Sequence, residues 1–405
     1  MSARYLYTDS GVFPLGILRD RQFVQRNGSS VEGIAPPFSC TGRLTLTTGI
    51  PVTTTDVLAA TTVYFTPLHH DDISLYTGND WARYAFTEKS IKLTDAQTGT
   101  THNGTKIIDG LADTSQFVRG MAITGTNVGA ASVIATVDSA TQITGTVNST
   151  GDGTNTITFK IPASKNVDIF GVLVSGNLAL RFGNFWTSDT ARNDALGSQN
   201  GYGNVNNAAI SSGDSNSVAA KTGLYLGTVR TTATAGQTED SLANANVSHR
   251  FLWNAYNRVP RTIQANPGGN DNSANTTYTV GAVATLAEAN GGTGSKLDFV
   301  LGLAIEPVIY NFSIGIQNDA SSQGAGGVGE DSTTTAQCAV YLLGASQLSG
   351  PANGRTVNFA VGYHYLDLLV CNATAAGTAA FYADFVRLGG GRDPRVSIIQ
   401  GVVWA

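Results

Sequence analysis

The run from Gly42 to Pro67 limits this chain to β-structure more strongly than any other segment. Within it, Leu44 and Leu46 alternate with polar residues, as in a strand with one buried face. Gly49 and Pro51 interrupt the run before a second predicted strand. Threonine rather than charge fills the polar positions, and β-branched side chains pack well on a pleated surface. The run therefore predicts sheet and disfavours helix.

Composition extends this prediction to the whole chain. Only 13% of the 405 residues are charged, whereas glycine alone accounts for 47 residues. Strands joined by Gly, Ser and Asn turns need little charge, while cytosolic enzymes usually carry more charge and more helix. The hydrophobic share of 41% excludes general disorder. A chain of this length can bury two or three cores, so we predict an all-β, multi-domain protein.

Charge and hydropathy exclude two classes of partner. The net charge is -5 and no dense Lys/Arg cluster occurs, so nucleic acid is not an expected partner. No apolar run reaches the about 18 residues of a membrane helix, so no membrane insertion is expected. The first residues lack the apolar core of a signal peptide, which predicts assembly in the cytoplasm of the producing cell.

The three cysteines predict no metal or redox chemistry. Cys40, Cys338 and Cys371 form no CxxC pair, so neither a zinc site nor a redox site is expected. Cys338 and Cys371 either pair or stay as separate buried thiols, and the usual behaviour of free cysteine favours the second arrangement.

Residues 1–40 differ from the rest because their apolar residues follow no sustained period. A segment this short cannot bury its aromatic side chains alone, so it has to pack on something else. Two arrangements remain open: an arm that docks on a neighbouring subunit or another protein, and an arm packed on its own domain. The docking candidates are the apolar residues Tyr5, Tyr7, Phe13, Leu15, Leu18, Phe23 and Phe38.

The middle of the chain is predicted to be a discontinuous β-module with an insertion. The module covers residues 41–102 and 162–262, and alternation returns at the start of its second part. Residues 103–161 carry their own strand pattern and are predicted to form an inserted small β-domain, because insertions at loop tips cost little stability. The polar stretch from Gly197 to Ser217 is predicted to be a mobile surface loop.

Residues 263–405 are predicted to form a C-terminal antiparallel β-sandwich or jelly roll. Only residues 282–290, with Ala284 to Ala289 at their centre, suit a short helix. The expected strands alternate apolar and polar residues between turn-rich loops and cover residues 308–316, 338–343, 357–366, 380–385 and 396–404.

Several motifs follow one another along the main module: the Thr-rich run, Ile73 to Tyr76, Trp81, Tyr84 to Glu88, Gly223 to Thr232, Gly236 to Ser241 and Arg250 to Val259. Their order resembles that in structural proteins of tailed bacteriophages. The resemblance covers roughly residues 40–262 without the insertion, and Gly362 to Leu366 with Phe381 and Tyr382 resembles the terminal domain of the same proteins. The insertion resembles a small β-module that recurs in phage and bacterial surface proteins.

The resemblance implies a non-enzymatic protein on the exterior of the virion. It implies a homotrimer that contacts other virion proteins of the head or tail through residues 1–40 and displays its later domains for adhesion to the host surface. Trp186, Tyr202 and Trp404 are candidates for stacking on host glycans, or equally for a place in the core. A glycan-degrading tail enzyme is the alternative function, and a bacterial surface adhesin is disfavoured by the missing export signal.

No motif predicts a catalytic residue, a cofactor or a metal ion. His69 to Asp72 holds metal-ligand types, but neighbouring residues of a strand face opposite sides, so a turn is predicted there. Residues 291–296 fail the spacing of a phosphate loop and, like Gly324 to Gly329, are predicted to be flexible loops. Hydrolysis of a glycan needs two carboxylates, and no local pattern selects a pair among Glu88, Glu239, Asp240, Glu306, Asp367 and Asp384.

Overall fold

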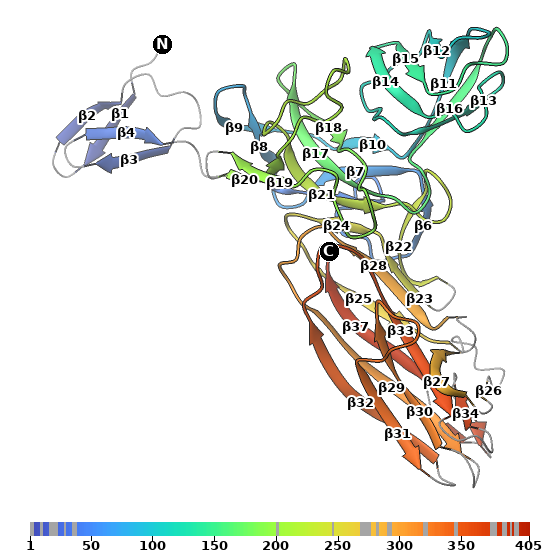
Figure 1. Ribbon diagram of the computed structural model, residues 1–405. Helices are drawn as coiled ribbons and strands as arrows, with labels where there is room; N and C mark the ends of the chain where they lie inside the picture. The colour runs from blue at the N-terminus through green and yellow to red at the C-terminus, as the bar shows by residue number, and fades with distance from the viewer. Residues whose placement is uncertain are drawn as a thin grey trace.

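The chain is built of strands, as the sequence predicts (Figure 1). No α-helix occurs in the residues described, and none of their segments is a helix able to cross a membrane. Within 4–34, 202–203, 243–244, 277–285, 317–318, 340–353 and 379–392 the backbone alone is described. The computed structural model describes residues 4–8, 11–15, 23–27, 30–34, 39–199, 202–244, 247–267, 277–280, 283–289, 294–318, 323–343, 347–372, 379–382, 387–388, 391–392 and 397–405.

The N-terminal segment forms two antiparallel hairpins. They are β1 (Arg4–Thr8) with β2 (Gly11–Leu15), and β3 (Phe23–Asn27) with β4 (Ser30–Ile34). Neither hairpin pairs with another strand in the described part of the chain. Of the docking candidates, Leu18 and Phe38 lie outside the described residues. The others lie in these strands, where only the backbone is described: Tyr5, Tyr7, Phe13, Leu15 and Phe23.

The Thr-rich run folds into the sheets of the β-module. One sheet has the order β10-β7-β5, β8 pairs with β9, and a third sheet has the order β18-β17-β21-β20-β19 with β24 beside β21. Leu44, Val63 and Ile169 are buried in their shared core. The strands are β5 (Gly42–Thr45), β7 (Thr62–Pro67), β8 (Asp72–Tyr76), β9 (Trp81–Ala85), β10 (Lys89–Lys92), β17 (Asn166–Val174), β18 (Asn177–Phe182), β19 (Leu196–Gln199), β20 (Tyr202–Asn206), β21 (Leu224–Arg230) and β24 (Leu252–Asn254).

A separate sheet lies where the insertion is predicted, and Figure 1 shows it beside the module. Its order is β13-β16-β11-β12-β15-β14, and β11 pairs with β16 over eight residues, from Thr94 opposite Lys160 to Thr101 opposite Gly153. The chain thus enters and leaves this sheet on adjacent strands. The strands are β11 (Thr94–Thr101), β12 (Ile107–Asp109), β13 (Ala122–Gly125), β14 (Ile134–Ser139), β15 (Gln142–Gly145) and β16 (Gly153–Lys160).

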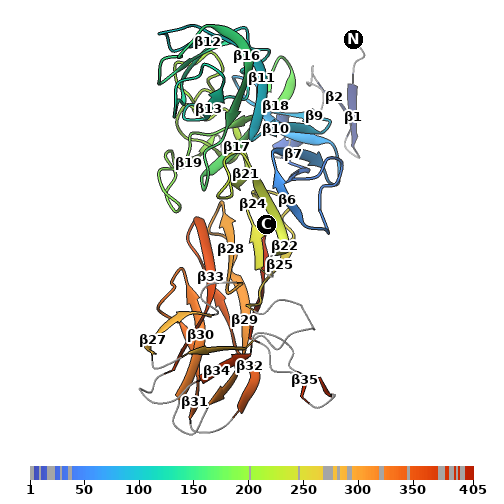
Figure 2. The ribbon, with the colours of Figure 1, turned by 90° about the vertical axis from the view of Figure 1, so that its right-hand side faces the viewer.

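The C-terminal residues form one large sheet with strands from the middle of the chain. Its main path is β26-β34-β29-β37-β25-β23-β28-β33-β30-β31, and β6, β22, β27 and β32 pair at its sides. It bends along its length (Figure 2). The strands are β6 (Val57–Ala60), β22 (Thr238–Asn244), β23 (Val247–Arg250), β25 (Pro260–Ala265), β26 (Thr277–Val280), β27 (Val283–Glu288), β28 (Lys296–Leu301), β29 (Val308–Asn318), β30 (Gln323–Glu330), β31 (Cys338–Leu343), β32 (Gln347–Val357), β33 (Gly362–Asn372), β34 (Ala379–Tyr382) and β37 (Ile398–Trp404), with a separate hairpin of β35 (Arg387–Leu388) and β36 (Gly391–Arg392).

Within this sheet only β23 and β28 run parallel, among the pairs described. Because β22, β23 and residues 260–262 of β25 come from the predicted module, one sheet joins the module to the C-terminal strands. The predicted domain boundaries stay predictions. A second core, which includes Phe299, Tyr310 and Phe312, lies along this sheet.

Three predictions about local structure in this sheet are wrong. The segment expected to be helical contains β27, because pairing with β33 outweighs the helix propensity of its alanines. Gly324 to Gly329 lie inside β30 rather than in a loop. A Cβ at Gly326 would lie 1.9 Å from Ile314 Cδ1, so glycine allows close packing there. The strand expected over 357–366 is interrupted between β32 and β33.

Gly197 to Ser217 is not simply a loop either, because β19 and β20 form a hairpin at its start. Its later residues are fastened to the insertion. The Asn216 side chain donates to the Phe117 carbonyl over 2.8 Å, and Arg119 binds the Asp214 carboxylate through Nη2 at 2.6 Å. This segment therefore joins the module to the inserted sheet.

Candidate functional site

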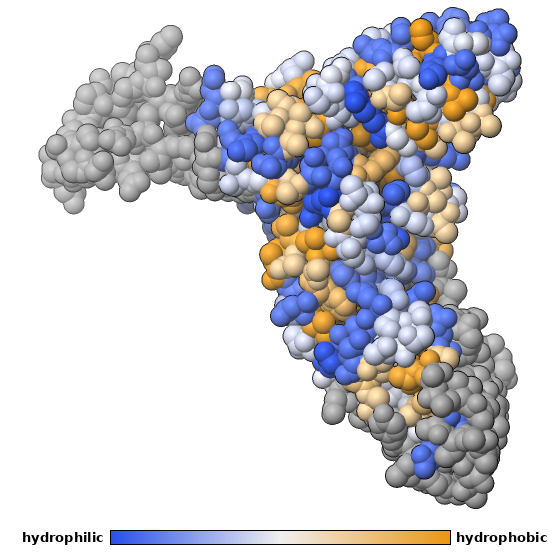
Figure 3. All heavy atoms as spheres, in the orientation of Figure 1, coloured by the Kyte–Doolittle hydropathy of each residue, from blue (hydrophilic) through white to orange (hydrophobic). Residues whose placement is uncertain are grey.

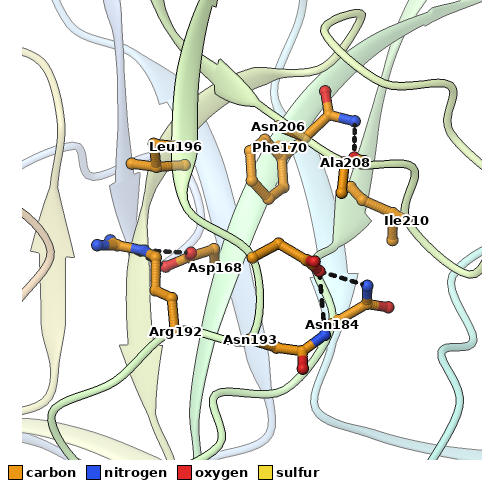
Figure 4. A pocket seen from close by; sticks show the side chains of 11 residues that line it. Asp168, Phe170, Asn184, Arg192, Asn193, Leu196, Asn206, Ala208 and Ile210 are labelled. Atoms are coloured by element: carbon orange, nitrogen blue, oxygen red, sulfur yellow. Dashed lines mark hydrogen bonds and ion pairs between the residues drawn. The ribbon is translucent and has the colours of Figure 1, made fainter.

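A buried polar cluster lies where the module meets the C-terminal strands. Asp168 on β17 places a carboxylate in a strand whose first seven residues are all buried, and such a charge needs a partner. Arg192 supplies it, with 2.7 Å between Nε and Asp168 Oδ2 (Figure 4). Thr228 donates its hydroxyl to Asp168 Oδ1 over 2.6 Å. The carboxylate is therefore neutralised and hydrogen-bonded.

Arg192 also reaches across to the C-terminal strands. Its Nη2 donates to the Gly302 carbonyl over 2.5 Å, and its guanidinium lies 4.4 Å from the centroid of the Trp186 ring. Burial lowers the pKa of Arg192, but Asp168 and Tyr225 outweigh burial and leave this pKa above its ordinary value. Arg192 thus stays charged and ties two sheets together.

Tyr225 completes the cluster as a neutral hydroxyl. Burial, with a smaller effect from Asp168, raises the pKa of Tyr225 well above its ordinary value. Its hydroxyl lies 2.6 Å from Thr228 Oγ1 and accepts from Arg192 Nη2 over 3.2 Å. Every member of the cluster has a polar partner, so the arrangement suits a structural clamp better than acid or base catalysis.

A cavity of about 20 Å³ opens beside this cluster (Figure 4). Phe170, Asn206 and Ile210 line it, together with Asn184 and Asp194. This volume holds about one water molecule. It is too small for a substrate or an organic cofactor.

The three candidate glycan-stacking aromatics have different surroundings. Trp186 is 2% exposed and lies under Arg192, so it belongs to the core rather than to a glycan surface. Trp404 on β37 is 37% exposed and stays a candidate. Tyr202 lies on β20, where its side chain is outside the described residues.

The residues of metal-binding type from His69 to Asp72 lie between β7 and the start of β8. Asp72 forms an ion pair with Arg83. In the described part of the chain, no three His, Cys, Asp or Glu residues gather in a way that could hold a metal ion. Cys40, Cys338 and Cys371 are all free thiols, of which Cys371 is buried.

The candidate carboxylates have different partners, and among the described ones only Glu239 and Asp240 are neighbours, on β22. Glu88 accepts from Thr48, Thr66 and the Gly49 amide, while Glu239 lies 3.7 Å from His249 Nδ1. Asp240 binds two arginines and Glu306 pairs with Arg258. Asp367 is fully buried, and Asp384 lies outside the described residues.

Asp168 and Arg192 were not predicted from the sequence. The available signal was a lone carboxylate within the apolar run from Val167 to Val172, which a buried strand carries only with a cationic partner. That signal does not identify the partner, because Arg192 lies 24 residues further along the chain.

No family model matches the chain, and no curated protein matches it. A solved insecticidal delta-endotoxin of Bacillus thuringiensis is similar at 9% identity and a TM-score of 0.21; the match covers 90% of this chain and 52%, about half, of the toxin chain. Structures of the Gx and Gt strains of infectious bursal disease virus match at 10% and 11% identity, both with a TM-score of 0.18. They cover 77% and 87% of this chain and 76% of each viral chain. TM-scores this low do not indicate a shared fold.

Proposed function

We propose that this chain is a non-enzymatic structural protein on the exterior of a tailed-phage virion, as a head-decoration, head-fibre or tail-fibre component. The observation that carries the proposal is the arrangement of its sheets. Two N-terminal hairpins pair with no other described strand, and they precede an all-β body of several sheets. This arrangement suits a projection that attaches by one end and displays the other, and the ordered phage-like motifs support it.

The polar clusters favour a structural role over catalysis. The Asp168 cluster is internally paired, and the cavity beside it holds about one water molecule. A glycan-degrading tail enzyme is the competing function. Incubation of the purified protein with host capsular polysaccharide or lipopolysaccharide separates the two, because only the enzyme releases reducing ends.

We propose a homotrimer, supported by apolar side chains that one chain leaves exposed. Ile305, Ile309 and Trp404 are 53%, 50% and 37% exposed. Ile309 on β29 lies opposite Val402 on the adjacent strand β37, which also carries Trp404. Figure 3 shows apolar residues gathered along one side of the molecule near the junction of its upper and lower parts. Packing between chains would remove such surface from water.

The proposed partners are other virion proteins and glycans of the host surface, with no nucleic acid and no membrane insertion. Assembly would take place in the host cytoplasm. Residues 1–40 would contact the capsid or tail, and the later domains would face outward.

Deletion of residues 2–38 tests this division of roles. We expect the shortened protein to stay soluble and trimeric, with a mass by light scattering near three times that of its chain, because the body has its own cores. It should no longer incorporate into particles in a complementation assay. Normal incorporation would refute the docking role of the arm.

A further inference from the structure

A second, larger hollow lies outside the small cavity, between the inserted sheet and the module. It has a volume of about 400 Å³, within the range of small-molecule sites. Arg119 lines it from the insertion, Asn184 and Phe185 from the segment after β18, and Ser211 and Ser212 from the segment after β20. Three stretches of chain far apart in sequence therefore build one surface.

Contacts behind the hollow hold its walls in place. Arg119 binds Asp214 through Nε at 3.1 and 3.0 Å and through Nη2 at 2.6 Å, and Nη2 also donates to the Ser212 carbonyl over 2.9 Å. The Ser215 amide donates to the Val137 carbonyl over 2.8 Å. The insertion and the module are thereby fixed to each other at this point, so the hollow is pre-formed.

One polar group in the wall lacks a partner. Ser211 is 4% exposed, and its Oγ makes no hydrogen bond to the residues described. A buried hydroxyl without a partner costs free energy. Ser211 also lines the hollow, but because this oxygen is itself shielded from solvent, it reaches a ligand hydroxyl there only after rotation of its side chain.

The remaining groups offer both an apolar surface and polar contacts. The half-buried Phe185 packs against the core and against Gly120, where a Cβ would lie 3.1 Å from its ring. Asn184 and Asn193 donate to Asp194 Oδ2 over 2.7 and 3.1 Å. Aromatic rings pack on the C–H face of a pyranose, while amides and hydroxyls bind its hydroxyl groups.

The charges select against an acidic ligand. Among the described residues that line the hollow, Arg119 is the only charged one, and its ion pair with Asp214 neutralises it. The wall therefore offers no free cation to a carboxylate or sulfate.

We infer that this hollow binds a neutral saccharide unit, a hexose or an N-acetylhexosamine. The inference rests on the proposed function, because it gives the expected glycan adhesion a location. It places adhesion at Phe185 and the module-insertion junction rather than at the buried Trp186 or in the C-terminal strands.

Saturation-transfer NMR on the full chain tests the inference with maltose, lactose and N,N′-diacetylchitobiose as probes and glucuronic acid as an acidic comparison. We expect at least one neutral probe to bind with a Kd at or below about 10 mM. Ser212→Trp should weaken binding at least about tenfold, because it fills the hollow while keeping its main-chain bond to Arg119. Phe185→Leu should do the same by removing the ring.

Ser217→Trp is the matched control, because Ser217 is exposed in the same segment but does not line the hollow. It should bind like the unchanged protein, and thermal unfolding of each variant verifies that it is folded. No neutral binding, equal binding by the folded Ser212→Trp protein, or preference for glucuronic acid would overturn the inference. Because purified protein is used, this result is independent of incorporation into particles.

Discussion

At the scale of single residues, Asp367 on β33 has the least favourable surroundings among the candidate carboxylates. It is fully buried, with Glu288 and Ser295 as polar neighbours. Burial, followed by the nearby Glu288, raises the pKa of Asp367 to about 7. The folded protein therefore holds a proton there at pH values where the unfolded chain has released it.

This shift predicts a stability that falls as pH rises. Because the pKa of Asp367 is raised in the folded state, this residue destabilises the protein least below about pH 4, where its carboxyl group is protonated. The free-energy cost to the folded state increases between about pH 4 and 7 and is constant above that range. Asp367→Asn removes the charge, so its free energy of unfolding should depend less on pH across this interval. Urea unfolding at several pH values measures the difference.

Asp138→Asn is the control for this experiment because Asp138 is exposed. It should keep the pH dependence of the unchanged protein. An unchanged slope in Asp367→Asn would contradict the assignment of a buried, protonated carboxyl group.

Sequence patterns could not predict which of two neighbouring aromatic side chains is buried. The sequence left Trp186 open as either a glycan-stacking ring or a core ring, because no local pattern decides between the two. Trp186 became core because Arg192 covers it, whereas Phe185 lines the outer hollow. Such a distinction depends on residues distant in sequence, which no local period encodes.

At the scale of elements, an arginine-carboxylate network holds the shared sheet to the start of the module. Asp240 on β22 accepts from Arg250 over 2.6 Å and from Arg261 over 2.8 Å. Arg261 also donates to the Thr53 carbonyl over 2.6 Å. Arg43 on β5 donates to the main-chain oxygens of Asn257 and Ala405, each over 2.7 Å.

Asp240→Asn should destabilise the protein by about 3 kcal/mol, because two largely buried arginines then lack their shared counter-charge. The loss should appear as a lower urea midpoint with the slope of unfolding unchanged. Asp152→Asn, a neutral replacement at an exposed position directly before β16, should change the midpoint little. A loss below about 0.5 kcal/mol in Asp240→Asn would mean that the network contributes little.

The strands themselves were largely predictable. Segments with clean alternation, such as Val308 to Ile316, became strands because one face is buried whichever partner they take. The glycines of β30 and the alanines of β27 were mispredicted because their conformation depends on the strand they pair with and not on a local pattern. Their conformation is set by pairing with β33, whose paired residues lie 38 or more positions further along for the glycines of β30 and 81 or more for β27.

At the scale of the whole molecule, two N-terminal hairpins precede a module with an inserted sheet, and a large sheet continues from the module. Continuity of the sheet through β22, β23 and β25 gives the body a single hydrogen-bonded path from its middle to its end. A protein that is attached at one end and presents its other end outward needs a firm connection between the two ends, and a continuous sheet provides one. The saccharide hollow lies where the insertion joins this body.

An electron-microscopy map of the phage particle that contains this protein would show whether it stands on the outside of the particle. We expect three-fold density outside the capsid or tail into which the body fits, with the hairpins β1 to β4 at the particle surface and the insertion facing away. Purified particles that lack the protein, or density that encloses it inside the capsid, would rule out an exterior position.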